Sequence, residues 1–263
     1  MKNKLTLVLL CAISLTISCK KPLREEPYPC PPLIMLTKVT GTSRLDGDGS
    51  LKTVNMVFSY NQSNLLVKIK DGKKGIDISY TDVAYLTNVL YSDSSAAVAK
   101  RRLLEVLVLR PFNQPLKEQE SIYEGDQLVS KSILDYTYTD ELVTKVERTR
   151  NNQLVSEQRY TYKNGNMITH DDGAGKIYKY EYGVNRNPFN DIALKFRPGT
   201  MDFTSINEPT AVEEIQNGST KKITNTYTYN TEGYPLTLKS IDSNGVLVVD
   251  YKFEYGTFPV GCY

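Results

Sequence analysis

The single histidine of the chain lies beside two carboxylates, in the segment His170-Asp171-Asp172-Gly173. One imidazole and two carboxylates could ligate a metal ion or transfer protons. The same Asp- and Gly-rich segment, however, separates two apolar segments, Met167-Ile168 and Ile177-Tyr178. That arrangement is typical of a hairpin turn, because Asp and Gly tolerate turn conformations. We therefore interpret Asp171-Asp172-Gly173-Ala174-Gly175 as a turn.

A second acidic segment, Asp46-Gly47-Asp48-Gly49-Ser50, is similar to the beginning of a calcium-binding loop. An EF-hand loop needs a glutamate at its twelfth position, and the twelfth residue counted from Asp46 is Val57. The chain also has no Gly-x-Ser-x-Gly nucleophile elbow and no zinc-like spacing of Cys and His. We predict no catalytic, metal or cofactor site and expect a non-enzymatic protein. A hydrolase with a carboxylate pair stays open, because it needs only two of the 30 acidic residues.

The first 18 residues have the features of a secretory signal peptide. Lys2 and Lys4 form a positive start, and an apolar stretch of 14 residues, Leu5 to Ser18, follows. This stretch is shorter than the roughly 20 apolar residues that a membrane-spanning helix needs. Cys19 comes next, after Leu15-Thr16-Ile17-Ser18. These residues resemble a bacterial lipobox, with the leucine one place too early, and they would also suit ordinary signal peptidase.

The residues after Cys19 favour a lipid anchor over simple secretion. Residues 20–29 are polar and rich in proline, as suits a semi-extended tether between a membrane and a domain. Acyl chains on Cys19 would bind the membrane through burial of methylenes, each contributing about 0.8 kcal/mol. We therefore predict a signal peptide over residues 1–18, a lipidated Cys19 with its tether over 19–33, and one β-repeat domain over 34–263.

The remaining cysteines could form a disulfide. Cys11 leaves with the signal and Cys19 takes the lipid, so that Cys30 and Cys262 stay near opposite ends of the domain. The oxidising compartment of an exported protein allows such a pair to form a disulfide. Closing so long a loop contributes roughly 5 kcal/mol in the chain-entropy model. Two unpaired thiols are the alternative.

The charge of the chain argues against a nucleic-acid partner. The whole sequence has 32 basic and 30 acidic residues, and Lys2 and Lys4 leave with the signal, so that the mature chain is balanced. Proteins that bind nucleic acids normally have a basic excess on one face, because phosphate contacts dominate their affinity.

The main organising signal is a recurring aromatic-x-aromatic pair followed by a turn. The chain has 19 Tyr and no Trp, a composition that favours β-strands. Tyr136 and Tyr160 are 24 residues apart, and so are Tyr227 and Tyr251. Such a period indicates a repeated unit of two strands, with Asn-Gly and Asp-Gly where hairpins need positive φ. The pattern is interrupted near residues 183–220, which we interpret as an insertion. Residues 102–109 could form a buried strand or a short helix, and the stop at Pro111 and the β-branched neighbours favour the strand.

The tyrosine pairs should form stripes, because side chains at i and i+2 share one face of a strand. We consider three roles for them: packing in the core, an exposed aromatic face for a glycan, and the lining of a cavity for an apolar ligand. The candidate face comprises Tyr136, Tyr138, Tyr160, Tyr162, Tyr178, Tyr180, Tyr227 and Tyr229.

The segment from Tyr227 to Leu236, in which Tyr-Thr-Tyr leads into Asn-Thr-Glu-Gly, resembles the YD-type repeats of Rhs proteins. With the lipoprotein-like start and Asn187-Pro188-Phe189, the chain is similar to Bacteroidota lipoproteins of unknown function with an extended, porin-like antiparallel sheet. Over residues 50–258 this resemblance implies an all-β, strongly curved antiparallel meander, forming a half-barrel or an incomplete barrel. It implies no catalytic residues.

These observations predict a non-enzymatic envelope lipoprotein, anchored in the outer membrane by its N-terminal lipid, with a binding or scaffolding role. Its expected partners, besides the membrane, are a glycan, a lipid or another envelope protein. The first alternative is a carrier that holds a lipid or another apolar ligand in a cavity of the curved sheet. The second is a glycan hydrolase of the envelope that uses a carboxylate pair.

Overall fold

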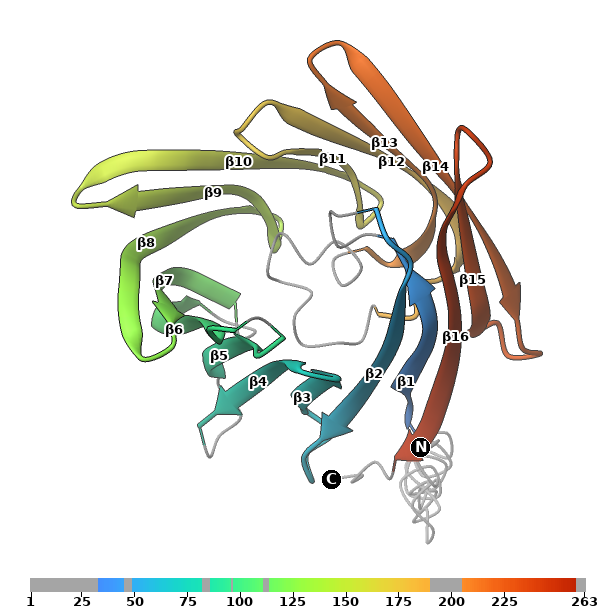
Figure 1. The fold of residues 1–263 in the computed structure, drawn as a ribbon, viewed down its shortest axis with the longest axis horizontal. Coiled ribbons are helices and arrows are strands. Elements are labelled where there is room, and N and C mark those ends of the chain that lie inside the picture. The colour runs from blue at the N-terminus through green and yellow to red at the C-terminus, as the bar shows by residue number, and fades with distance from the viewer. Residues whose placement is uncertain are drawn as a thin grey trace, which may run out of the picture. The chain divides into compact units, whose positions relative to one another are not determined.

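The computed structural model describes residues 33–44, 49–81, 86–95, 97–110, 114–189 and 205–258 (Figure 1). Within this part of the chain, Ile34–Phe258 form one compact unit built of β-strands. No helix among these residues is long and apolar enough to cross a membrane. The predicted signal peptide, Cys19, Cys30 and Cys262 lie outside the described residues, and the division into domains stays a prediction.

The described residues form sixteen strands. In chain order they are β1 (Leu33–Ser43), β2 (Lys52–Tyr60), β3 (Leu66–Asp71), β4 (Lys74–Tyr80), β5 (Leu86–Asp93), β6 (Lys100–Arg110), β7 (Gln114–Glu124), β8 (Gln127–Thr139), β9 (Leu142–Arg150), β10 (Gln153–Lys163), β11 (Asn166–Asp171), β12 (Lys176–Arg186), β13 (Asn207–Gln216), β14 (Ser219–Tyr229), β15 (Pro235–Asp242) and β16 (Leu247–Phe258). The predicted strand over residues 102–109 is part of β6, but the expected burial is wrong for Leu107 and Val108, which are exposed. In the interrupted span near 183–220, β12 continues to Arg186 and β13 begins at Asn207.

Each strand pairs with its neighbours in sequence, and β1 pairs with β16, so that the sheet closes into a barrel (Figure 1). At this closure the backbone N–H of Arg44 donates to the carbonyl of Val248 over 2.8 Å. The two strands lie so close that a Cβ on Gly41 would be 1.8 Å from the carbonyl oxygen of Asp250. Gly41 also has a φ of +145°, which suits glycine.

The all-β prediction is confirmed, but the predicted half-barrel or incomplete barrel is wrong. Hairpins pair strands that are adjacent in sequence, and these local pairings produce the repeat that the sequence displays. Closure depends instead on contacts such as that of Lys38 with Glu254, which are 216 residues apart. No local pattern reports such a pairing.

Within the described ranges, four tight hairpin turns have two central residues with positive φ, the geometry of type I′ turns. This geometry matches the right-handed twist of the strands that it joins, and Asn and Gly adopt it most readily. The turns are Asp140-Glu141, Asn151-Asn152, Asn164-Gly165 and Asn217-Gly218.

Most buried apolar side chains belong to two clusters on the inner wall of the barrel. The first belongs to β1–β5 and β16, with Phe189 packed among them. The second belongs to β6 and β8–β12 and contains Tyr136, Tyr160 and Tyr180. The inner wall is therefore apolar and aromatic over much of its area.

The outer wall carries charged side chains. Asp135, for example, lies between the buried Leu134 and Tyr136 on β8, so that it faces outward and pairs with Lys117 at 3.0 Å. Threonine pairs add to this wall, as where the hydroxyls of Thr228 and Thr237 lie 2.7 Å apart. Further outward ion pairs include Lys38–Glu254, Lys68–Asp77, Lys145–Glu147, Arg159–Glu157 and Lys222–Glu181.

Candidate functional site: a cavity in the inner wall

A cavity of about 500 Å³ lies against the inner wall formed by β2–β7. This volume is within the range of small-molecule binding sites. Its apolar lining consists of Met56, Ile69, Ile76, Tyr91 and Ile122, and its charged lining consists of Asp71, Lys74, Asp93, Lys100, Arg101 and Arg102.

The strand register explains the apolar part of this lining. Cross-strand partners point to the same face of a sheet, so that a chain of partners forms a row of side chains along the wall. Ile69 pairs with Ile76, Ile76 with Tyr91, and Tyr91 with Arg102. Arg102 in turn pairs with Ile122. The row is apolar except for one arginine.

A second row crosses the same strands two residues nearer to the hairpin ends. Asp71 pairs with Lys74, Lys74 with Asp93, and Asp93 with Lys100. Lys100 pairs with Glu124. The sign of the charge alternates from strand to strand, which stabilises the pairing. The hydrogen bonds from Ser95 and the nearby Lys74 and Lys100 lower the pKa of Asp93. The cavity thus has an apolar floor and a charged rim.

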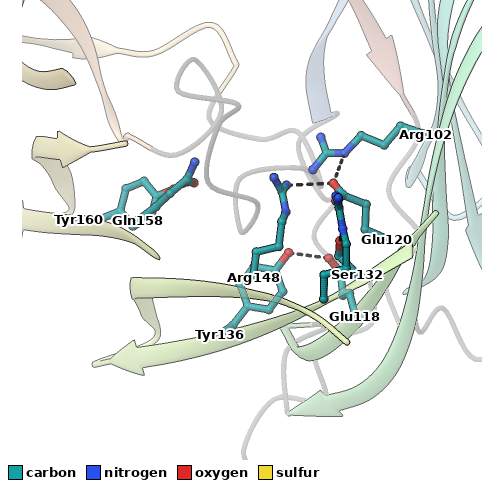
Figure 2. Close-up of polar contacts among 9 residues, drawn as sticks. Arg102, Glu118, Glu120, Ser132, Tyr136, Arg148, Gln158 and Tyr160 are labelled. Carbon is teal, nitrogen blue, oxygen red and sulfur yellow. Dashed lines mark hydrogen bonds and ion pairs between the residues drawn. The ribbon is translucent and has the colours of Figure 1, made fainter. Parts of the chain in front are cut away.

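Arg102 is held in place by two neighbours. Its Nε donates to Oε1 of Glu120 over 2.7 Å, and its guanidinium carbon lies 5.3 Å from the ring centroid of Tyr91. Nη2 of Arg148 donates to the same oxygen of Glu120 over 3.0 Å (Figure 2). Glu120 is only 2% exposed, so that one buried carboxylate joins two guanidiniums from β6 and β9.

A second buried carboxylate lies on the same strand. Oε2 of Glu118 accepts a hydrogen bond of 2.6 Å from the hydroxyl of Tyr136 (Figure 2). On β10, the hydroxyl of Tyr160 donates to Oε1 of Gln158 over 2.6 Å. Oε2 of Glu120 is buried without a hydrogen-bond partner among the described residues. Such a buried acceptor is costly unless a donor reaches it.

Glu118 and Glu120 were not among the site residues predicted from the sequence. In the segment Lys117-Glu118-Gln119-Glu120 the two acids look like the solvated face of a strand. The signal that could have identified them is their period, because Glu118, Glu120 and the cavity-lining Ile122 are spaced by two and share the inner face.

His170 is packed between two tyrosine rings and is 7% exposed. Its ring lies 4.7 Å from that of Tyr160 and 5.5 Å from that of Tyr178, and both pairs are stacked. Burial lowers the pKa of His170, while Asp172 and Asp171 oppose that shift. Residues 172–175 connect β11 and β12, as the turn interpretation expects.

The carboxylates beside His170 serve the turn. Oδ1 of Asp171 accepts from the backbone N–H of Gly173, and Oδ1 of Asp172 accepts from those of Ala174 and Lys176. Among the described residues, no group of three His, Cys, Asp or Glu side chains could hold a metal ion. Of the calcium-like segment, residues 46–48 lie outside the described part of the chain.

The eight tyrosines of the predicted aromatic face are buried or half-buried. Tyr136, Tyr160 and Tyr180 are at most 7% exposed and belong to the second apolar cluster. Tyr227 and Tyr229 stack on each other with ring centroids 6.2 Å apart. None of the eight lines the 500 Å³ cavity, which uses Tyr91 instead.

Fold and site together define a closed, sixteen-stranded antiparallel barrel with a cavity of mixed polarity in its inner wall. No protein-family model matches the sequence, and no curated protein matches it. Two solved structures are similar to it. A porin-like protein from Bacteroides uniformis has 11% identity and a TM-score of 0.52, with 84% of this chain and 96% of that chain covered. A porin-like protein from Bacteroides vulgatus has 11% identity and a TM-score of 0.52, with coverage of 85% and 99%.

At this level of identity the likeness shows the fold. The predicted porin-like antiparallel fold is confirmed, and both neighbours come from Bacteroides, which agrees with the expected Bacteroidota resemblance. The lipid anchor, the YD-type repeat and the disulfide stay predictions.

Proposed function

We propose that the protein is a non-enzymatic binding protein of the bacterial envelope, which takes a small apolar or amphipathic molecule into the cavity of its inner wall. A lipid on Cys19 would hold it at the outer membrane. The observation that carries the proposal is the cavity of about 500 Å³ over an apolar row of side chains, inside a closed barrel. The cavity supports a ligand carrier rather than a protein with a purely scaffolding role.

The outer wall supports a barrel that stands in water beside the membrane. A barrel that crosses a bilayer has an outward apolar band about 25 Å tall, and a basic residue at its midplane costs about 2–4 kcal/mol. Here the ion pairs Lys68–Asp77, Lys117–Asp135 and Lys222–Glu181 lie on outward faces around the barrel. The inner wall of this barrel also differs from the polar, water-filled lumen of porins, because it carries two apolar clusters.

Binding of a neutral fluorescent probe, N-phenyl-1-naphthylamine, tests the cavity. We expect saturable binding by the wild type and loss of binding in Ile76→Trp, because the indole would fill the space above the apolar row. Val57→Trp is the matched control, since Val57 is 42% exposed and faces outward on β2 between Met56 and Phe58. Circular dichroism would establish that both variants keep the barrel. Equal binding by both variants would place the probe elsewhere and contradict the proposal.

For the hydrolase alternative, Glu118 and Glu120 are a candidate pair, because both are buried and lie two residues apart on β7. Both already have protein partners, Glu118 at the hydroxyl of Tyr136 and Glu120 at two guanidiniums. We therefore propose binding without catalysis. If the wild type hydrolysed nitrophenyl glycosides and Glu118→Gln abolished this activity, this part of the proposal would be overturned.

A further inference from the structure

We propose that Arg102 binds the headgroup of the ligand, so that the cavity selects amphiphiles with a carboxylate or phosphate group on an apolar chain. This inference rests on the proposed ligand-binding function and specifies the chemistry of its ligand. Three observations support it. Arg102 lies within the apolar row, Glu120 and Tyr91 hold its guanidinium in place, and the nearby carboxylates accept hydrogen bonds from protein donors.

Arg102 is the charged member of a row that otherwise consists of Ile69, Ile76, Tyr91 and Ile122. Its side chain is 40% exposed and lines the cavity. An anion that contacts Arg102 would therefore have apolar side chains on both sides of it. Such surroundings suit a headgroup that continues into an aliphatic chain.

The guanidinium is positioned before a ligand arrives. Glu120 binds its Nε and the ring of Tyr91 lies beneath it, which leaves the two terminal Nη groups as the part of the fork that can meet a ligand. Paired Nη donors match the two oxygens of a carboxylate or phosphate. Because the side chain is already fixed, binding loses little of its rotamer entropy.

The carboxylates around the cavity are engaged with protein donors. Oδ1 of Asp71 accepts from the backbone N–H of Asn55 over 2.9 Å. Asp93 accepts from the backbone N–H of Ser95 over 2.8 Å. Glu120 receives two guanidiniums at one oxygen, so that the triad of Arg102, Glu120 and Arg148 has one positive charge in excess.

Lys100 adds to the attraction for an anion at the rim of the cavity. Its Nζ lies 3.7 Å from Oε1 of Glu124, and its side chain is 65% exposed, so that the ion pair is loose and screened by water. An anion entering from the hairpin ends would pass Lys100 before it reaches Arg102, which lies two residues further along β6.

Displacement of N-phenyl-1-naphthylamine from the mature, detergent-free protein tests the inference with ligands that share a twelve-carbon chain. The competitors are dodecanoate, dodecyl phosphate, dodecanol and dodecyltrimethylammonium. We expect one or both anions to compete at least about tenfold better than the alcohol, since a hydrogen bond to a charged group contributes about 1.5–3 kcal/mol. Comparison of dodecanoate with dodecyl phosphate distinguishes a fatty-acid ligand from a phosphate lipid.

Arg102→Gln should lower the affinity for the anionic competitors about tenfold. The affinity for dodecanol should stay within about twofold of that of the wild type. Arg159→Gln is the matched control, because Arg159 also pairs with a carboxylate, Glu157, but faces outward on β10 and does not line the cavity. If Arg102→Gln fails to fold, Arg102→Lys keeps the charge without the fork and should lose part of the preference.

The outcomes separate the two proposals. Failure of the wild type to bind the neutral probe would overturn the ligand-binding function itself. Binding of the probe with equal displacement by all four competitors, or an unchanged preference in Arg102→Gln, would overturn the headgroup inference alone.

Discussion

The hydroxyl of Tyr138 on β8 donates a hydrogen bond of 2.6 Å to the backbone carbonyl oxygen of Pro115 on β7. The same contact recurs around the barrel: a tyrosine near the end of an even-numbered strand binds a carbonyl within the first four residues of the preceding strand. The other examples are Tyr60 to Leu36, Tyr80 to Leu66, Tyr182 to Met167 and Tyr255 to Pro235. The tyrosine pairs of the sequence therefore join neighbouring strands at one end of the barrel.

Tyr138→Phe should lower the free energy of unfolding by about 1 kcal/mol, because it removes one half-buried hydrogen bond and leaves the carbonyl of Pro115 without its donor. Urea unfolding followed by circular dichroism would measure the change. Tyr123→Phe on the outer wall is the control, and its hydroxyl has no hydrogen bond among the described residues. A Tyr138→Phe variant as stable as this control would contradict the role of the hydroxyl.

Glu141→Gly should raise the free energy of unfolding by about 0.5–1 kcal/mol. Glu141 has a φ of 69° in a type I′ turn, a conformation that costs an L-residue about 1–2 kcal/mol, and glycine relieves that cost at a smaller expense of backbone entropy. Thermal and urea unfolding would measure the difference. Glu141→Ala keeps the strained conformation and should show little or no gain, so that equal effects of the two substitutions would refute the explanation.

The stability of the protein should depend on pH through His170. Because burial lowers its pKa below the ordinary value of 6.5, the folded state favours the neutral imidazole. This contribution is present above pH 6.5 and is lost as the pH falls through the lowered pKa. His170→Phe keeps an aromatic ring between Tyr160 and Tyr178 but does not titrate. Its urea midpoint should therefore fall less than that of the wild type between pH 7.5 and 5, and parallel curves would exclude this role.

The lipid on Cys19 should be the means by which the protein binds the membrane. Intact mass spectrometry of the membrane-extracted protein should give residues 19–263 plus two or three acyl chains. A mature Cys19→Ser chain should stay monomeric without detergent and show no conductance in planar bilayers, because the outer wall is charged. An unmodified Cys19, or stepwise conductance, would show that the strands or another segment interact with the bilayer.

We predict a disulfide between Cys30 and Cys262. Cys30 lies three residues before β1 and Cys262 four residues after the end of β16. β1 begins and β16 ends at the same edge of the barrel, and only a few residues of sequence separate each cysteine from that edge. The mass should rise by two hydrogens on reduction. Cys30→Ser should then lower stability by about 2–4 kcal/mol, and an unchanged mass on reduction would exclude the bond.

The candidate site was only partly predictable from the sequence. The tyrosine pairs were visible, because a period of two within a strand and of 24 between repeats is a local signal. Arg102, Glu118 and Glu120 were not, because a charged residue in an alternating strand is normally solvated. The contact of Glu120 with both Arg102 and Arg148 depends on β6, β7 and β9 forming one wall, which is a matter of register between strands.

The sequence by itself determined the β-strands, their hairpin turns and the aromatic repeat, because each depends on residues close together along the chain. The closed barrel, the inward direction of the tyrosines and the cavity were decided by the tertiary structure alone. Closure pairs β1 with β16 across more than 200 residues, and only a closed sheet has an inside. Once the inside exists, alternation along each strand places charges such as Asp135 in water and Arg102 beside an apolar row.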